Sequence, residues 1–129
     1  MPNWIFVMTG NNADFLTRTS SGKWPIFKRT VNRNDLKKGD NVIFYVGGNS
    51  NKKIMGSATV NSGLEVNGDE FSVDLSDVQI LDKPIRMSSI LESLVFIRNK
   101  KNWGAYMQGG VVRLPKTDYN TIIEKIAKQ

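Results

Sequence analysis

The sequence contains no cysteine and no histidine. Without cysteine there is no disulfide, no thiolate nucleophile and no thiolate metal site. Without histidine the chain lacks the side chain that most often acts as a general base and as a ligand of transition metals. Carboxylates alone could still hold Mg²⁺ or Ca²⁺, but the acidic residues are dispersed along the chain. We therefore expect a protein that is not an enzyme and that uses no metal ion or cofactor.

Long apolar runs are also absent, because no stretch approaches the roughly 20 residues that a membrane-spanning helix needs. The N-terminal residues MPNWIFVMTGNN have no basic segment ahead of their apolar part, unlike a secretory signal peptide. These two features predict a cytoplasmic protein that does not enter a membrane. The length of 129 residues is that of one compact domain, so we expect a single domain over residues 1–129.

Acidic residues are outnumbered: 12 Asp and Glu stand against 18 Lys and Arg, which gives a formal net charge of +6. A basic balance of this size favours polyanionic partners, with nucleic acid first and an anionic membrane surface second. On charge alone, a basic protein without any such partner is the alternative.

Apolar and polar residues alternate in several short segments that turn residues separate, a pattern typical of strands. Gly56 marks a bulge or a close backbone approach, and the alternation reverses phase near Ser76–Asp77, which also indicates a bulge. Because bulges bend a sheet, we expect an α+β fold, an open β-barrel of about six strands wrapped by short helices. The expected elements are strands over 3–9, 41–46, 53–60, 70–80 and 109–115, a helix after an Asn12 cap, a loop over 20–25, a short helix in 87–94 that runs into a strand at 95–97, and a helix over 116–128.

Two stretches place aromatic side chains directly against basic ones: WPIFKR at residues 24–29 and RNKKNWGAY at residues 98–106. Single-stranded nucleic acid requires this combination of charge and stacking surface, since each stacked base contributes roughly 1–3 kcal/mol. Glycines near the second aromatic would let a flat ligand approach the backbone closely. The alternative is that Trp24 plugs one end of the barrel as a core residue and that the charged runs are ordinary solvated faces.

From these stretches we predict a nucleotide site in which Trp24 and Trp103 face one shared pocket. Polar residues that follow the first strand could read a base edge, although Asn12 could equally serve as a helix cap. The predicted base-binding residues are Trp24, Trp103, Tyr106, Phe27, Thr9, Asn11 and Asn12. The predicted phosphate-binding residues are Lys28, Arg29, Arg33, Arg98, Lys100 and Lys101.

Four segments, taken in order, carry a resemblance to a known family: NWIFVMTG, KWPIFKRTVNR with LKKGDNVIFYV, KKIMGSATV, and LVFIRNKKNW with VVRLPKTDYNTIIEKI. The chain resembles the EVE domain of the PUA-like superfamily over essentially its whole length, and most closely the small single-domain archaeal and bacterial members. The resemblance implies a PUA-like open barrel wrapped by short helices and related to the YTH and ASCH domains. Larger relatives carry W-x-G-V-R-N around the loop tryptophan, whereas this chain has WPIFKR, so Pro25 sets this loop differently.

The resemblance also implies a function, because the related domains read nucleic-acid bases, in several cases modified ones, in an aromatic-lined pocket. We therefore expect a non-catalytic nucleic-acid-binding module that recognises a flipped, methylated base in an aromatic pocket with a basic rim. Two other classes stay open: a sensor of a small nucleobase-like ligand, and a protein-interaction subunit. The residues do not distinguish DNA from RNA or one modification from another, and they do not fix the oligomeric state.

Overall fold

The computed structural model describes residues 2–48 and 52–128. Its strands are β1 (Asn3–Thr9), β2 (Lys23–Ile26), β3 (Asn41–Gly47), β4 (Lys53–Val60), β5 (Glu65–Asn67), β6 (Glu70–Arg86) and β7 (Val111–Leu114). Its helices are α1 (Asn12–Ser21), α2 (Met87–Ile90) and α3 (Lys116–Ala127), together with the 3₁₀ helices η1 (Arg33–Asp35), η2 (Leu91–Ser93) and η3 (Lys100–Met107).

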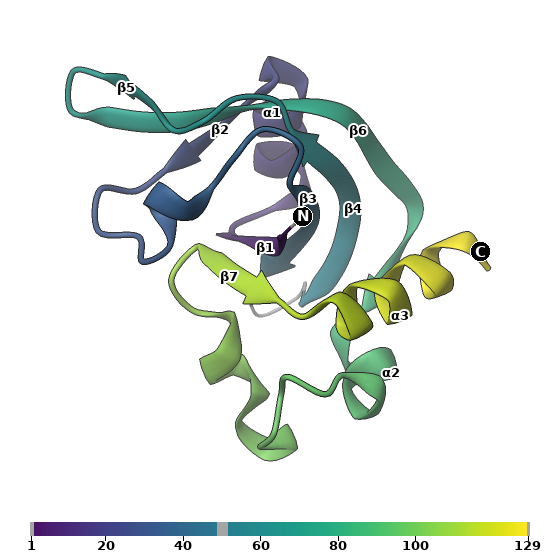
Figure 1. Cartoon of the computed structure of the whole chain (residues 1–129). Coiled ribbons are helices and arrows are strands. Elements are labelled where there is room, and N and C mark those ends of the chain that lie inside the picture. The colour runs from purple at the N-terminus through teal and green to yellow at the C-terminus, as the bar shows by residue number, and fades with distance from the viewer. Residues whose placement is uncertain (1, 49–51, 129) are drawn as a thin grey trace.

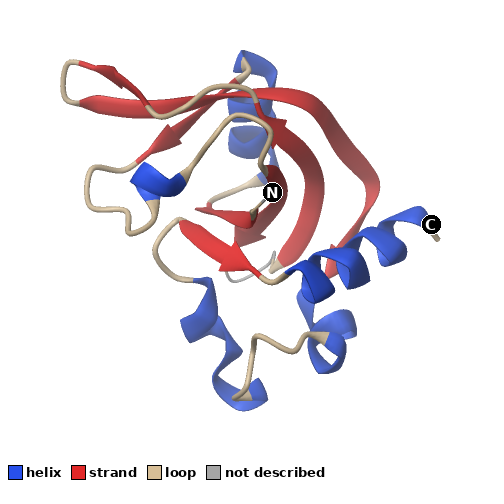
Figure 2. Ribbon diagram, in the orientation of Figure 1, coloured by secondary structure: helices blue, strands red, loops and turns tan. Residues whose placement is uncertain are grey.

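The strands form one curved, mixed sheet in the order β2-β6-β4-β3-β1-β7, and β5 pairs with β6 outside this path. β1 runs parallel to β3, and the other pairs are antiparallel. Figure 1 shows the sheet curling into a half-barrel, with α2 and α3 outside its curve. The expected open barrel of about six strands with short helices around it is confirmed (Figure 2).

Strand alternation produces two separate cores, one on each face of the sheet. In β1, Trp4 and Phe6 point into the first core, inside the barrel, while Ile5 points into the second. The neighbours Phe44 and Tyr45 of β3 divide in the same way. The second core is closed by residues of α2, η3 and α3. Because both faces are covered, the central strands read as continuous apolar runs rather than as alternating ones.

Two irregularities between β4 and β6 bend the sheet, as the sequence predicts. The pairing of these strands shifts register twice along its length, and Asp77 adopts a positive φ of 52° at the expected phase reversal. At Gly56, a Cβ atom would lie 2.1 Å from the carbonyl oxygen of Gln79, so only glycine allows this approach of the two backbones. β6 therefore continues around the bend as far as Arg86 and is longer than the predicted strand.

The loop predicted over 20–25 is wrong except at Gly22, since Ser20 and Ser21 are the last two residues of α1. Lys23–Ile26 form β2, which pairs antiparallel with β6. β2 is an edge strand of the sheet. An edge strand tolerates Pro25, because a proline lacks the backbone N–H that a strand in the middle of a sheet would have to donate to a neighbour. Trp24 consequently lies in a strand whose side chains alternate, and its indole points into the first core.

The strand predicted at 95–97 is also not formed. Asp118, in the first turn of α3, accepts hydrogen bonds from the backbone N–H groups of Val95, at 2.7 Å, and Phe96, at 2.8 Å. These two N–H groups therefore bond to the buried carboxylate of Asp118 and not to the backbone of a neighbouring strand. The segment runs as a loop clamped to α3 and leads directly toward η3.

The start of α1 differs from the prediction by one residue. Asn11 is the N-cap, since its side-chain oxygen accepts a hydrogen bond from the Asp14 N–H at 2.8 Å. Asn12 is the first residue of the helix rather than its cap. The last strand begins at Val111, two residues later than predicted, because Gly109 and Gly110 form a turn with positive φ values of 94° and 78°.

Candidate functional site

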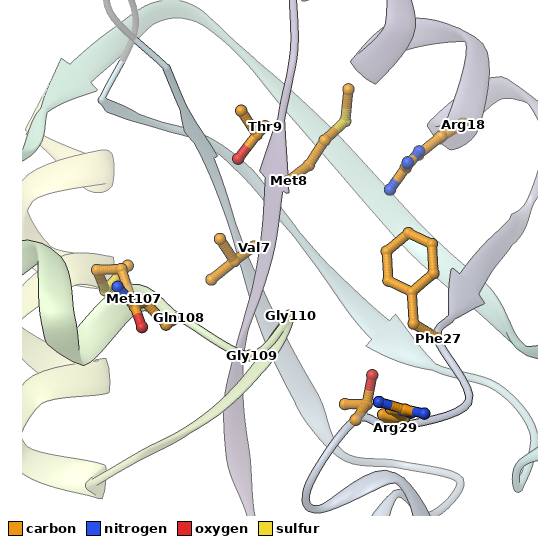
Figure 3. A pocket seen from close by; sticks show the side chains of 11 residues that line it. Val7, Met8, Thr9, Arg18, Phe27, Arg29, Met107, Gln108, Gly109 and Gly110 are labelled. Atoms are coloured by element: carbon orange, nitrogen blue, oxygen red, sulfur yellow. The ribbon is translucent and has the colours of Figure 1, made fainter.

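A cavity of about 550 Å³ opens where β1 ends, beside the segment that follows β2 and the turn that precedes β7. We call it the Phe27 cavity, after the aromatic ring on its wall. Figure 3 shows side chains from these separate parts of the chain around it. Its lining residues are Val7, Met8, Thr9, Arg18, Phe27, Arg29, Thr30, Met107, Gln108, Gly109 and Gly110.

The walls of the Phe27 cavity are held by the ends of secondary-structure elements. Phe27 follows the buried Ile26 of β2, and 64% of its surface is exposed, so the ring is available to a ligand. On the opposite wall, the carbonyl of Gly110 accepts a hydrogen bond from the backbone N–H of Val7 at 2.7 Å. That bond fixes the glycine turn against β1 and brings Gln108 to the rim (Figure 3).

Arg18 reaches the Phe27 cavity from α1 across the buried ring of Trp24. Its guanidinium carbon lies 5.2 Å from the centroid of the Trp24 ring, a distance at which a cation is attracted to the aromatic face. Trp24 is itself held between Phe6, at 5.8 Å, and Phe44, at 5.0 Å, measured between ring centroids. The buried tryptophan therefore supports a cationic side chain at the wall of the cavity.

The Phe27 cavity is apolar with a basic, hydrogen-bonding rim. Two guanidinium groups, Arg18 and Arg29, line it together with the Thr9 hydroxyl and the Gln108 amide. None of the described residues that line it is acidic. A flat ligand could stack on Phe27 while its acceptor atoms meet guanidinium donors, so the arrangement suits binding of an electron-rich or anionic ring compound.

Trp103 lines a second cavity of about 570 Å³, which we call the Trp103 cavity. The indole packs edge-to-face on Tyr45, with 6.2 Å between ring centroids. The shared pocket predicted for Trp24 and Trp103 is not formed. Trp24 packs against Phe44 inside the barrel, whereas Trp103 packs against Tyr45, the next residue of β3, which points to the other face of the sheet.

The sequence model of the EVE domain matches residues 3–125, nearly the whole chain. This chain belongs to the EVE domain family. The family resemblance stated from the sequence is confirmed. No curated protein matches this EVE domain in sequence.

Solved structures share the fold of this EVE domain at low sequence identity. A hypothetical protein from Leishmania major is 15% identical with a TM-score of 0.73, and the match covers 100% of this chain and 96% of that one. Human THYN1, solved in complex with DNA that contains 5-methylcytosine, is 11% identical with a TM-score of 0.70 over 100% and 99% of the two chains. The YTH domain of Zygosaccharomyces rouxii MRB1, in complex with N6-methyladenosine RNA, is 14% identical with a TM-score of 0.64 over 96% and 86%.

Three of the predicted site residues, Thr9, Phe27 and Arg29, meet in the Phe27 cavity of this EVE domain. Lys28 lines a different cavity that shares Phe27 with the first. Lys101 lines the Trp103 cavity. Arg98 is exposed on the loop before η3.

Two predicted residues make internal contacts that order the chain around η3. The ammonium group of Lys100 donates hydrogen bonds to the backbone carbonyls of Leu94 and Ile97. The hydroxyl of Tyr106 accepts a hydrogen bond from the Asn99 N–H at 3.2 Å, and its ring packs on the second core. The positive charge of Lys100 is therefore used to hold loop carbonyls.

Two of the remaining predicted residues, Arg33 and Asn11, also have local partners. The guanidinium of Arg33 lies 5.6 Å from the ring centroid of Phe71 and donates to the carbonyl of Thr30 at 3.4 Å. Asn11 caps α1 with its side chain, and Asn12 is exposed in the first turn of that helix. Both asparagines lie outside the set of residues that line the Phe27 cavity.

Sequence reasoning missed the other eight residues that line the Phe27 cavity, among them Arg18, Gln108 and the two methionines Met8 and Met107. Arg18 lies about two helical turns after the Asn11 cap, on a stretch whose sequence is typical of an ordinary solvated helix. The pair Gly109–Gly110 carried the best available signal, because two adjacent glycines before a strand indicate a tight turn.

Burial affects one titratable group near the site. Desolvation raises the pKa of Tyr45, which lines the Trp103 cavity, to about 12. Within residues 2–48 and 52–128, no helix is long and apolar enough to cross a membrane. Over the same residues, no group of three or more carboxylates is placed to hold a metal ion.

Proposed function

We propose that this EVE domain is a non-catalytic nucleic-acid-binding module that holds one extruded, methylated base in the Phe27 cavity. The observation that carries this proposal is the cavity itself, which is lined by an exposed Phe27 ring with an arginine on either side of it and, among the described residues, by no carboxylate (Figure 3). THYN1 and the YTH domain of MRB1 share this fold and were solved with nucleic acids that carry methylated bases.

The size and polarity of the Phe27 cavity fit an extruded base. Its volume of about 550 Å³ falls in the range of small-molecule sites, roughly 300–1,000 Å³. Extrusion of a base from a stack costs a few kcal/mol, and stacking on an aromatic ring offsets much of that cost. A methyl group on the base would lie against Met8, Met107 or Val7, where each buried carbon contributes about 0.8 kcal/mol.

The polar groups of the cavity divide into two roles. Arg18 is held against Trp24, so its donors are positioned to meet acceptor atoms on the edge of the base, with Thr9 and Gln108 beside it. Arg29, together with Lys28 of the adjoining cavity, is exposed next to Phe27 and would contact the flanking phosphates. A subunit that only contacts proteins is expected to fill such a cavity with its own side chains, and this cavity is open.

The test compares binding of labelled single-stranded oligonucleotides by fluorescence anisotropy. The probes are DNA with one 5-methylcytosine, RNA with one N6-methyladenosine, and their unmodified counterparts. We expect tighter binding of at least one modified probe, and Phe27→Ala should weaken that binding by roughly 1–3 kcal/mol. Val66→Ala serves as the control, because Val66 is equally exposed at 64% but lies on the β5–β6 hairpin.

Two outcomes would contradict the proposal. If the wild-type protein binds none of the four probes, or if Phe27→Ala binds as the wild type does, the Phe27 cavity is not a base site. Binding to nucleic acid should also weaken as salt rises, by a slope of about −0.7 per contacted phosphate on a log–log plot. Two results together would indicate the small-ligand sensor instead. The affinity for the free modified nucleoside would not depend on salt concentration, and the oligonucleotide that contains the same base would bind no more tightly.

A further inference from the structure

The Trp103 cavity is a second aromatic and basic site that the Phe27 cavity does not use. Its lining residues include the half-buried Trp103, the two exposed lysines Lys52 and Lys101, Asn102 and Tyr45. In the part of the chain that the structure describes, no acidic residue contributes to its lining. A stacking surface and two positive charges therefore stand together here, on the other face of the sheet from Trp24.

The two cavities lie at the same end of the sheet, on either side of η3, and no described residue lines both. β1 and β3 run parallel, and their last residues, Thr9 and Gly47, are register partners. Thr9 lines the Phe27 cavity, and Gly48, which follows Gly47, lines the Trp103 cavity. η3 contributes residues to both, with Trp103 in one cavity and Met107 in the other.

The separation along η3 is small. Four residues of a 3₁₀ helix span about 8 Å, since each adds about 2.0 Å along the axis. Trp103 and Met107 are four residues apart in the part of η3 that follows its kink at Asn102, so the backbone rise between them is of this size. The connection between the two sites is therefore short enough for consecutive nucleotides of one strand.

The platform that presents Trp103 is fixed by the chain itself. Lys100 holds the carbonyls of Leu94 and Ile97, and the side chain of Asn99 accepts hydrogen bonds from the N–H groups of Lys101, at 3.2 Å, and Asn102, at 3.4 Å. These bonds order the start of η3 without occupying the ammonium group of Lys101. A pre-ordered stacking surface loses little conformational entropy when a ligand binds.

We infer that the Trp103 cavity holds the nucleotide next to the extruded base on the same strand. Its base stacks on Trp103, and its phosphate lies between Lys52 and Lys101. This inference rests on the proposed function of the Phe27 cavity and adds to it a two-nucleotide path across η3. It also predicts that a free modified nucleoside, which reaches only the Phe27 cavity, binds more weakly than the same base within an oligonucleotide.

The experiment measures two ligands with each variant: the modified oligonucleotide that the wild type binds best, and the free nucleoside of the same modified base. Trp103→Leu retains apolar bulk but removes the aromatic face, and Trp103→Phe restores a smaller one. We expect Trp103→Leu to weaken oligonucleotide binding roughly 5- to 150-fold, with partial recovery in Trp103→Phe. Nucleoside binding should change less than about twofold in both variants.

A charge test accompanies the stacking test. Lys101→Ala should make the salt slope of oligonucleotide binding shallower by about 0.7. Lys128→Ala removes the same charge from the C-terminal end of α3, which Figure 1 shows away from the loops at the cavities, and should leave the slope unchanged.

The outcomes separate this inference from the proposed function. If Phe27→Ala loses binding but Trp103→Leu binds the oligonucleotide as the wild type does, the Phe27 cavity stands and the path across η3 is wrong. If Trp103→Leu weakens the nucleoside and the oligonucleotide equally, its effect is structural and the inference is wrong. If the wild type binds no probe, both are wrong.

Discussion

Asp118 offers the sharpest test of how the fold is held around the site. Its carboxylate is fully buried and accepts hydrogen bonds from two backbone N–H groups, at 2.7 and 2.8 Å, on the loop that leads to η3. Hydrogen bonds to a charged group contribute about 1.5–3 kcal/mol each, and two backbone donors left buried without a partner add to the cost. Asp118→Ala should therefore lower the free energy of unfolding by about 3–5 kcal/mol, a large part of the 5–15 kcal/mol typical of a domain.

A conservative variant makes this prediction quantitative. Asp118→Asn keeps the shape and one acceptor oxygen but turns an NH₂ group toward the second N–H donor, so it should lose about 2–3 kcal/mol. Urea unfolding followed by tryptophan fluorescence measures both values. Thr117→Ala, one residue earlier and exposed, should change stability by less than about 0.5 kcal/mol. If Asp118→Ala is no less stable than Thr117→Ala, the carboxylate clamp does not hold this loop.

Two further predictions concern aromatic residues of the two cores. Trp24→Ala should destabilise the fold by about 3–5 kcal/mol, because the indole packs against three aromatic rings; an exposed ligand-stacking residue would lose binding without this loss of stability. Tyr45 has an ordinary pKa of 10 when unfolded and about 12 in the fold, so its contribution to stability is complete below pH 10 and is lost as the pH rises to about 12. The free energy of unfolding should fall by roughly 2–3 kcal/mol over this range. Unfolding curves recorded from pH 9 to 12 should show this fall in the wild type but not in Tyr45→Phe. An identical pH dependence in both proteins would show that Tyr45 does not titrate as described.

Periodicity predicted most of the sheet, because the strands that build it carry strong local signals. The continuous apolar run of β1, the phase reversal at Asp77 and the close approach at Gly56 each follow from one short segment. β2 was missed because its signal is not local. An edge strand of four residues with a proline resembles a loop, and only its pairing with β6 shows otherwise.

The candidate site was predicted less well, since it depends on which face of the sheet a residue takes. The aromatic and basic stretch at residues 24–29 predicted Phe27 and Arg29, and the end of the first strand predicted Thr9; the structure places all three in one cavity. The prediction of a pocket shared by Trp24 and Trp103 is wrong. Trp24 packs on Phe44 and Trp103 packs on Tyr45, and these neighbours in β3 point to opposite faces of the sheet. Arg18 could not be found from sequence, because only the folded chain places its guanidinium against the Trp24 ring at the wall of the cavity.

The position of β1 in the sheet has a consequence for how this chain folds. The strand comes first in the sequence, yet its neighbours are β3 and β7, and Asn3 pairs with Leu114 near the other end of the chain. Contacts of such wide sequence separation must close a long loop before they contribute, which slows folding compared with helical domains of the same size. During synthesis, one edge of an almost wholly apolar strand stays unpaired until β7 has left the ribosome. In this interval the chain is most exposed to aggregation through that edge.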